Sequence, residues 1–262
     1  MRDPRAIAAI AGVAGVITLL VLHGSALVTL EAPTAKSPTH SGSNTAVKVP
    51  PPPSANIDDI LASLSGKGIT ASDLELVNVS AAASRGAPFR MFVFRNGDPV
   101  SRLLREVGAW GPLETSAFAS VLQPDCVTST GRALVLDAGA NLGFFTLLAA
   151  SHGCRVISFE PSPRLCAIIA ASAALNGLSD RIRIVNAGVG SVPGTLTYIF
   201  DPANPSLSRI TGESLDRLPA NGNLEYTAVP IVTLESERPP ESVLLLKIDT
   251  EVRLKHRAHS LC

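Results

Sequence analysis

Charged side chains are scarce in this 262-residue chain, at 17% of the sequence. Lysine plus arginine equals aspartate plus glutamate, 22 each, so no net charge attracts a nucleic acid. The four cysteines contain no CxxC pair, which argues against a zinc site. They are also too few and too scattered for a disulfide framework. We therefore expect each cysteine to be a buried or free thiol.

A long, mostly apolar stretch covers residues 6–30. Because roughly 20 apolar residues suffice for a helix to cross a bilayer, this stretch is predicted as a transmembrane signal anchor. Arg2 and Arg5 precede it, so by the positive-inside tendency residues 1–5 form a cytosolic tail and the remainder is lumenal. A cleaved signal peptide, with small residues around 24–26, and an organelle transit peptide are the alternatives.

Residues 31–56 differ in composition, because six prolines are mixed with serine, threonine, lysine and asparagine. Such a segment buries too little apolar surface to fold and is predicted as an extended stalk. Anchor, stalk and globular part form the layout of a single-pass type II membrane protein that faces the ER or Golgi lumen. A secreted or organelle-targeted protein is the alternative. Asn78-Val79-Ser80 fits a glycosylation acceptor, which is usable only in a lumenal domain.

The globular part has two sections, residues 57–125 and 126–251. In the first, helices are expected over 57–64 and 114–122 and a strand over 91–95. In the second, strands are expected over 133–137, 155–160, 182–186, 195–200 and 244–249, with helices over 144–151 and 163–176. Short apolar strands that alternate with helices indicate βαβ units. The predicted fold class is therefore α/β, with a Rossmann-like parallel sheet.

The turn after the first of these strands has the composition of a cofactor site. Asp137 ends the strand, and Gly139 to Gly143 form a G-x-x-x-G segment that enters a helix. Gly139 lets the backbone approach a ligand, and the helix N-terminus offers N–H groups to a carboxylate. These features suit the methionine end of an adenosyl cofactor, with Asp137 binding the ammonium directly or through water. A nicotinamide cofactor would need G-x-G-x-x-G, which this segment lacks.

A second acid, Glu160, ends the next strand. In Rossmann-like sheets an acid at this point accepts hydrogen bonds from both ribose hydroxyls. Because adjacent parallel strands end at one edge of the sheet, we expect Asp137 and Glu160 on neighbouring strands there. Asn141 is predicted either to contact the ligand or to stabilise the turn.

Six segments in this order together resemble the FkbM family of methyltransferases: VLDAGANLGFFTLLAA, VISFEPSP, LNGL, IVNAGVGSVPG, VPIVTLE and LLLKIDTE. The resemblance extends over residues 110–251. It implies a class I methyltransferase fold, with a seven-stranded, mostly parallel sheet that uses S-adenosyl-L-methionine. It also implies methylation of oxygen on a sugar, glycan or other hydroxylated small molecule.

The same resemblance implies roles for residues further along the chain. Asn186 and Ala187 would line the adenine pocket, and Asp249 would lie at the end of the fourth strand, near the methyl group. Asn186 could instead cap its strand, and Asp249 could cap a following helix. The base that removes the acceptor proton would be Asp249 or His152, although a helix-terminal role is the alternative for His152.

The family pattern stops after Glu251, and residues 252–262 form a divergent basic tail. We therefore expect a partial methyltransferase domain whose sheet is incomplete at its C-terminal strands, with an open edge that lowers stability. Two hypotheses follow. The first is a membrane-anchored, S-adenosylmethionine-dependent O-methyltransferase of the secretory pathway. The second is a catalytically inactive, truncated methyltransferase-like membrane protein that acts only as a binding partner.

Overall fold

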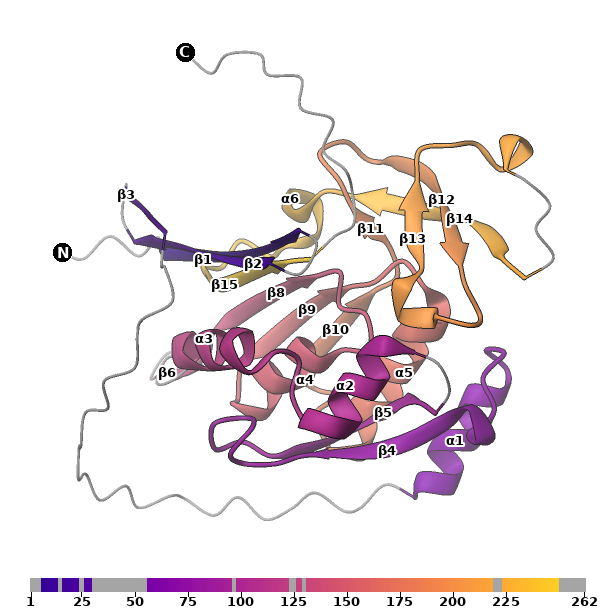
Figure 1. Ribbon diagram of the computed structural model, residues 1–262. Coiled ribbons are helices and arrows are strands. Elements are labelled where there is room, and N and C mark those ends of the chain that lie inside the picture. The colour runs from indigo at the N-terminus through magenta and orange to yellow at the C-terminus, as the bar shows by residue number, and fades with distance from the viewer. Residues whose placement is uncertain are drawn as a thin grey trace.

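A seven-stranded sheet lies at the centre of the computed structural model (Figure 1). The structure describes residues 6–13, 16–23, 26–29, 56–95, 98–122, 126–128, 131–218 and 223–249, the first three ranges by their backbone only. The strand order in the sheet is β10-β9-β8-β15-β1-β2-β3. In chain order these strands are β1 Ala6–Val13, β2 Val16–His23, β3 Ala26–Thr29, β8 Leu134–Ala138, β9 Arg155–Phe159, β10 Ile182–Val185 and β15 Val243–Ile248.

The four strands β10, β9, β8 and β15 are parallel to one another. Helix α4 (Phe144–Ser151) connects β8 to β9, and α5 (Pro163–Leu175) connects β9 to β10. Ser162 caps α5 by accepting a hydrogen bond from the Leu165 N–H, and Pro163 takes the first helical position. The predicted α/β class with a parallel sheet is confirmed, and the elements expected from 133 onward occur to within one residue.

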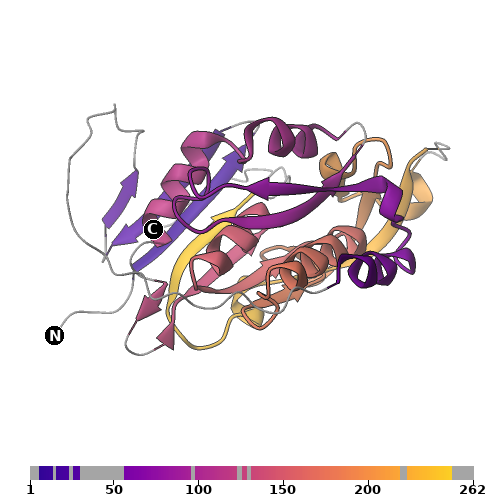
Figure 2. The ribbon, with the colours of Figure 1, turned by 90° about the horizontal axis from the view of Figure 1, so that it is seen from below.

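Helices and a hairpin cover one face of the sheet, as Figure 2 shows from below. These elements are α1 (Ile57–Ser65), β4 (Leu74–Val79), β5 (Phe89–Phe94), α2 (Pro99–Val107), α3 (Pro112–Leu122), α4 and α5. The hairpin is tied to α5 by the Phe92 N–H, which donates to Ser172 Oγ at 3.0 Å. Val135, Val156 and Leu245 belong to the main hydrophobic core on this side.

The opposite face carries a smaller apolar cluster that includes Leu136, Ile157 and Phe159. A second sheet, in the order β11-β14-β12-β13, follows β10 in the chain and lies at one end of the molecule (Figure 1). Its strands are β11 Gly188–Val189, β12 Gly194–Phe200, β13 Arg209–Thr211 and β14 Glu225–Val232. The remaining elements are α6 Leu234–Glu237, β6 Val127–Thr128, β7 Gly131–Arg132 and the 3-10 turns Ala71–Asp73, Pro205–Leu207 and Leu215–Arg217.

The N-terminal apolar stretch forms strands, so the helix predicted over residues 6–30 is wrong. β1 pairs in parallel with β15, β2 pairs antiparallel with β1, and β3 pairs antiparallel with β2. The physical reason is the edge of β15, whose unpaired N–H and C=O groups are satisfied by an added strand. Valine and isoleucine are frequent in these three strands and favour the strand conformation.

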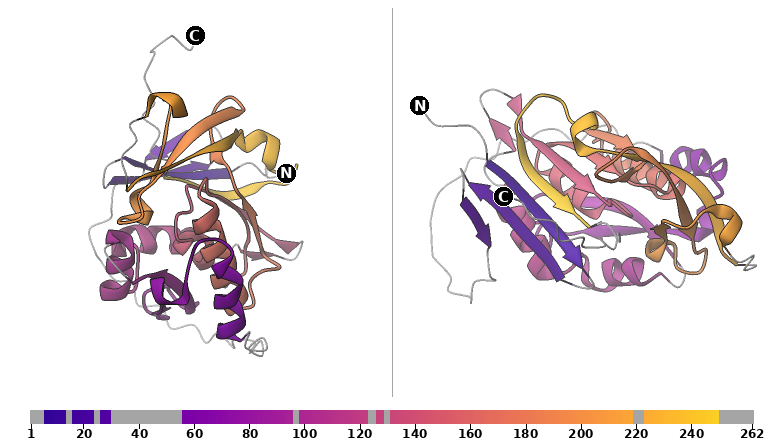
Figure 3. Two further views of the ribbon diagram at one scale, coloured as in Figure 1. Left: turned by 90° about the vertical axis from the view of Figure 1, so that its right-hand side faces the viewer. Right: turned by 90° about the horizontal axis from the view of Figure 1, so that it is seen from above.

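The sheet edge beside β15, which the sequence predicted to be open, is occupied by these strands. Figure 3 shows β1 and β2 beside β15 when the sheet is seen from above. Among the residues that the structure describes, no helix is both long enough and apolar enough to span a membrane. The predicted tails 1–5 and 252–262 and residues 31–55 of the predicted stalk lie outside the described residues.

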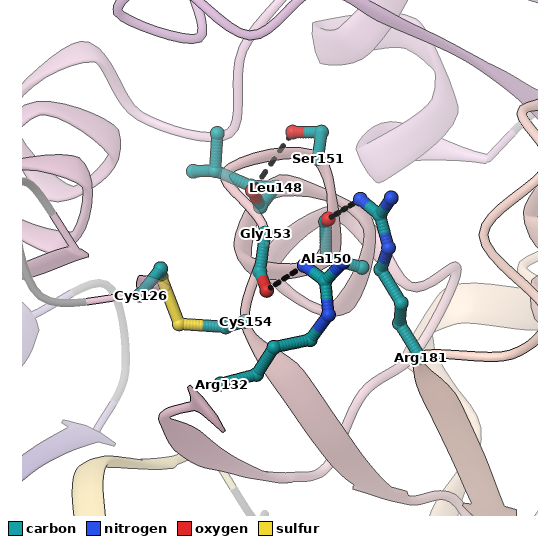
Figure 4. The surroundings of a disulfide bond; sticks show 8 residues. All are labelled: Cys126, Arg132, Leu148, Ala150, Ser151, Gly153, Cys154 and Arg181. Carbon is teal, nitrogen blue, oxygen red and sulfur yellow. Dashed lines mark hydrogen bonds between the residues drawn. A yellow bond between two sulfur atoms is a disulfide. The ribbon is translucent and has the colours of Figure 1, made fainter. Parts of the chain in front are cut away.

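A disulfide joins Cys126 to Cys154, which corrects the expectation of unpaired thiols (Figure 4). Cys126 directly precedes β6, and its carbonyl accepts from the Ala133 N–H, just before β8, at 3.0 Å. Cys154 lies between α4 and β9, and the two cysteine Cα atoms are 4.5 Å apart. A separation of 28 residues hides this proximity from the sequence. Around the bond, Arg132 donates to the Gly153 carbonyl at 2.8 Å, and Arg181 donates to the Ala150 carbonyl at 3.0 Å. Helix α4 is therefore tied to its surroundings at its C-terminal end.

Candidate cofactor and active site

Three predicted acids lie at one edge of the sheet, where the parallel strands β8, β9 and β15 end. Asp137 lies near the end of β8, Glu160 follows β9, and Asp249 follows β15. The Asp249 N–H donates to the Ala138 carbonyl at 2.9 Å, which fastens the end of β15 to β8. In open α/β sheets, ligands bind outside this edge of the strands.

The turn between β8 and α4 is left-handed at three residues. The φ angles are 79° at Gly139, 54° at Asn141 and 86° at Gly143. Glycine takes this conformation freely, and asparagine tolerates it better than most residues. At Gly143 a Cβ atom would also lie 2.8 Å from Ile169 Cγ1, so α4 and α5 could not pack as closely. The glycine spacing seen in the sequence is thus required by both the turn and the packing.

Every backbone N–H of this turn has a partner inside the protein. The N–H groups of Gly139 and Ala140 donate to the Phe159 carbonyl, Asn141 to Glu160 Oε2, Leu142 to Asn141 Oδ1, and Gly143 to the Ala140 carbonyl. Asn141 therefore stabilises the turn, which is one of the two roles expected for it. Helix α4 begins directly after this turn, whose N–H groups are all hydrogen-bonded.

Glu160 is almost completely buried, with 4% of its surface exposed. Its Oε1 accepts from the Ser162 N–H and its Oε2 from the Asn141 N–H, both at 2.8 Å. Burial raises the pKa of this carboxyl to about 7, although the two backbone N–H groups and Lys247 favour the charged form. Each carboxylate oxygen keeps a further lone pair, so the group has the capacity to receive two ribose hydroxyls.

Asp137 is fully buried and engaged by two side chains. Thr146 Oγ1 donates to its Oδ2 at 2.6 Å, and the Lys247 ammonium lies 3.1 Å from its Oδ1. Lys247 is the register partner of Asp137 on β15 and also donates to the Gly139 carbonyl at 2.7 Å. Asp137 thus lies behind the turn and neutralises Lys247. Lys247 is not among the residues predicted from the sequence, although a lysine inside the apolar run LLLKID is a visible signal.

The two residues that follow β10 lie close to the Glu160 loop. The exposed Asn186 donates from its side-chain amide to the carbonyls of Glu160 and Pro161, each at 2.9 Å. Ala187 is 2% exposed, and its N–H donates to the Val185 carbonyl. Asn186 therefore fastens the loop that carries Glu160.

The two candidate bases lie at opposite ends of α4. The Asp249 side chain is 36% exposed and lies 3.9 Å from the Lys247 ammonium, beside the turn. His152 caps the C-terminal end of α4, about 12 Å of helix away from the turn. Its Nε2 is hydrogen-bonded to the Ser84 carbonyl at 2.8 Å. Of the two, only Asp249 is in reach of a ligand at the strand ends.

Two further residues, Ser206 and Asp98, secure the turn from outside. The Asn141 side-chain amide donates to the Ser206 carbonyl at 2.9 Å. The Ser206 N–H and hydroxyl both donate to the buried carboxylate of Asp98, which also caps α2 through the Ser101 N–H. Asp98 and Ser206 are 108 residues apart in the sequence, so no local pattern could reveal this contact.

Comparison with known proteins supports a methyltransferase. Residues 137–251 match the family model described as the methyltransferase FkbM domain. This match confirms the resemblance seen in the motifs and supports S-adenosylmethionine as the cofactor. A curated relative, methyltransferase sdnD of Sordaria araneosa, is 27% identical over 96 residues. The alignment covers 36% of this chain and 37% of that relative, so the chain spans little more than a third of its length.

Two solved structures overlap with part of the chain. A SAM-dependent methyltransferase from Agrobacterium tumefaciens is 19% identical, with a TM-score of 0.31 over 44% of this chain and 33% of the other. PRMT6 is 24% identical, with a TM-score of 0.26 over 33% of this chain and 24% of the other. The overlaps are partial, so the fold described above rests on the strands and helices of this chain itself.

Proposed function

We propose that this chain is an S-adenosylmethionine-dependent methyltransferase that methylates a hydroxyl group of a small molecule or glycan. The observation that carries the proposal is Glu160, a buried carboxylate with spare lone pairs at the end of β9. It stands beside the left-handed turn from Gly139 to Gly143. An acid and a glycine turn in this relation fit the ribose and the amino-acid end of an adenosyl cofactor.

The residues of the site would align the two reactants. When bound, S-adenosylmethionine supplies a methyl group on a positively charged sulfur, so alignment of the acceptor is the main requirement. Glu160 would hold the ribose hydroxyls, and Asn186 and Ala187 after β10 would border the adenine. Asp249 would take up the proton that the acceptor oxygen releases as it gains the methyl group.

We also propose that the domain works in an oxidising compartment, such as the lumen of the secretory pathway. The disulfide between Cys126 and Cys154 supports this, because disulfides persist in such compartments and are rare in a reducing cytosol. The exposed side chain of Asn78, within a glycosylation tripeptide, fits the same location. A secreted or organelle-targeted protein is the alternative location.

A second candidate function is a catalytically inactive binding partner. One observation favours it: the cavity beside Asp249 is small, about 30 Å³, and leaves little room for an acceptor. In that case the cofactor edge would bind its ligand without turnover.

One experiment separates these functions. The full chain is titrated calorimetrically with S-adenosylhomocysteine and, as a control, with nicotinamide dinucleotides. It is then incubated with methyl-labelled S-adenosylmethionine and a panel of hydroxylated acceptors. Binding of the adenosyl ligand together with label on an acceptor oxygen supports the methyltransferase. Binding without transfer over the whole panel supports the binding partner, and the absence of binding contradicts both.

A further inference from the structure

The strand order at the site determines the orientation in which an adenosyl cofactor would lie across the strand ends. Glu160 follows β9, β8 lies next to β9, and β15 lies beyond β8. If the ribose is held at Glu160, the amino-acid end of the cofactor extends across the turn at Gly139 toward the end of β15. This direction rests on the function proposed above.

A small cavity lies at that place, between the turn, the start of α4 and the end of β15. Its volume is about 30 Å³, which is room for roughly two water-sized groups. Trp110, Phe144 and Phe145 line it together with Lys247 and Asp249. A carboxylate has two oxygens and matches this size.

The ammonium group of Lys247 is not fully hydrogen-bonded. It donates to the Gly139 carbonyl at 2.7 Å, whereas Asp137 Oδ1, 3.1 Å away, is an ion-pair partner that accepts no hydrogen bond. Within the described part of the chain, the next acceptor is Asp249 at 3.9 Å, which is beyond hydrogen-bonding distance. Because Lys247 is only 2% exposed, bulk water does not readily satisfy the remaining hydrogens of its ammonium group.

The turn itself offers no donor, because its five backbone N–H groups are all bonded within the protein. The positive groups left at the cavity are the Lys247 ammonium and the N-terminal end of α4, which begins at Phe144. We propose that Lys247 binds the α-carboxylate of the cofactor's methionine end. Asp137 orients the ammonium for this task, and the Gly139 carbonyl ties it to the turn.

The surrounding charges fit a zwitterionic ligand. Asp137 and Asp249 are both within 4.0 Å of the ammonium, so a bare anion would meet two negative charges. The methionine end of the cofactor brings its own α-ammonium group, which offsets the charge of its carboxylate. An amino-acid moiety therefore suits this cavity better than a phosphate, which would add negative charge alone.

The test compares two ligands that share the adenosyl thioether. S-Adenosylhomocysteine has the amino-acid end, whereas 5′-methylthioadenosine lacks it. Each is titrated calorimetrically into the full chain, and Lys247→Met is compared with the control Lys67→Met at an exposed position. We expect Lys247→Met to weaken S-adenosylhomocysteine binding at least about tenfold, with methylthioadenosine binding unchanged, because a charged hydrogen bond is lost. The control should leave both affinities unchanged.

A second variant protects the test against misfolding. Lys247→Met leaves Asp137 buried without a counter-charge, so the double variant Asp137→Asn with Lys247→Gln removes both charges together. The same selective loss is expected in the double variant. An equal loss for both ligands would make Lys247 only a support of the turn and overturn the proposal, as would no loss for either. If the unmodified chain binds neither ligand, the proposed function itself fails. If it binds methylthioadenosine and not S-adenosylhomocysteine, the carboxylate site alone is refuted.

Discussion

The two ends of the β8–α4 unit are held by different kinds of interaction. At the carboxyl end of β8, a buried ion pair between Asp137 and Lys247 supports the turn, and the buried Glu160 lies beside it. At the other end, a disulfide joins Cys126, which precedes β6, to Cys154, which lies between α4 and β9. One end is held by charges that a ligand can engage, and the other by a covalent bond that it cannot.

Under the proposed function, this difference marks where stability is given up for binding. Taking charges out of water costs free energy that their mutual attraction offsets only when the geometry is good. Asp137, Glu160 and Lys247 are all buried at the candidate cofactor edge. The disulfide lies at the end of the unit where no ligand is expected, and it can stabilise the same unit without competing for the site.

The largest expected effect is on the charged end. Lys247→Met should lower the free energy of unfolding by about 3–5 kcal/mol, because it leaves Asp137 buried and uncompensated. The double variant Asp137→Asn with Lys247→Gln should cost much less, since no lone charge remains. Urea unfolding followed by circular dichroism measures both. Equal midpoints for Lys247→Met and the unmodified chain would show that the pair is not desolvated.

Removal of the disulfide should lower the free energy of unfolding almost as much, without changing cofactor affinity. Opening a disulfide that spans 28 residues should cost roughly 3.5 kcal/mol by loop-closure entropy. The variant Cys126→Ala with Cys154→Ala, or the reduced protein, should unfold at lower urea and still bind S-adenosylhomocysteine within about twofold of the unmodified chain. A large loss of affinity for S-adenosylhomocysteine with unchanged stability would contradict the proposed difference between the two ends.

The pH response should come from the charged end. Burial raises the pKa of Glu160 to about 7 from 4.5, so the folded state binds more protons than the unfolded state between these values. Its contribution to the free energy of unfolding is therefore greatest below pH 4.5 and is lost as the pH rises to about 7. Cofactor affinity should move oppositely and fall up to about tenfold per pH unit below 7, because the ionised carboxylate is the better acceptor.

Calorimetry and urea unfolding from pH 5 to pH 8 measure this response. Glu160→Gln has no carboxyl to titrate and serves as the matched control. If Glu160→Gln showed the same pH dependence as the unmodified chain, a group other than Glu160 would be responsible for the titration.

The smallest effect on stability is expected at Asn78, which is exposed on β4 and belongs to neither end. When the full chain is produced in a eukaryotic secretory host, an N-linked glycan on Asn78 should increase its mass. Treatment with an enzyme that removes N-glycans should reverse this increase. Asn78→Gln should abolish the shift and change the free energy of unfolding by less than about 0.5 kcal/mol. Ser80→Thr keeps the acceptor pattern and should retain the shift. An unshifted chain that is secreted with its disulfide formed would contradict glycosylation at this position.

The β8–α4–β9 segment could be predicted from the sequence because its signals are local. An apolar run, an acid, two spaced glycines and a helix follow one another directly, and periodicity with turn residues fixes their boundaries. The glycines at 139 and 143 were expected to make a tight turn, and the structure has both at positive φ. Asp137 and Glu160 could be placed at one edge because adjacent parallel strands end together.

Contacts between distant residues could not be predicted. An apolar run such as residues 6–29 has the composition of a membrane helix and of buried strands alike, and its pairing with β15 depends on residues more than 200 positions away. The partners Cys126 and Cys154, and likewise Asp98 and Ser206, carry no spacing pattern. Lys247 stood in an apolar strand, and only the register with β8 reveals that Asp137 neutralises it.

The central claim is that the edge formed by β9, β8 and β15 binds an adenosyl cofactor through Glu160. Its most direct test is a calorimetric titration of S-adenosylmethionine into the full chain and into Glu160→Ala at pH 8. We predict one site per unmodified chain and an affinity lower by at least about tenfold in the variant, because hydrogen bonds to a charged group are lost. No heat of binding with the unmodified chain, or equal affinity in the two proteins, would contradict the claim.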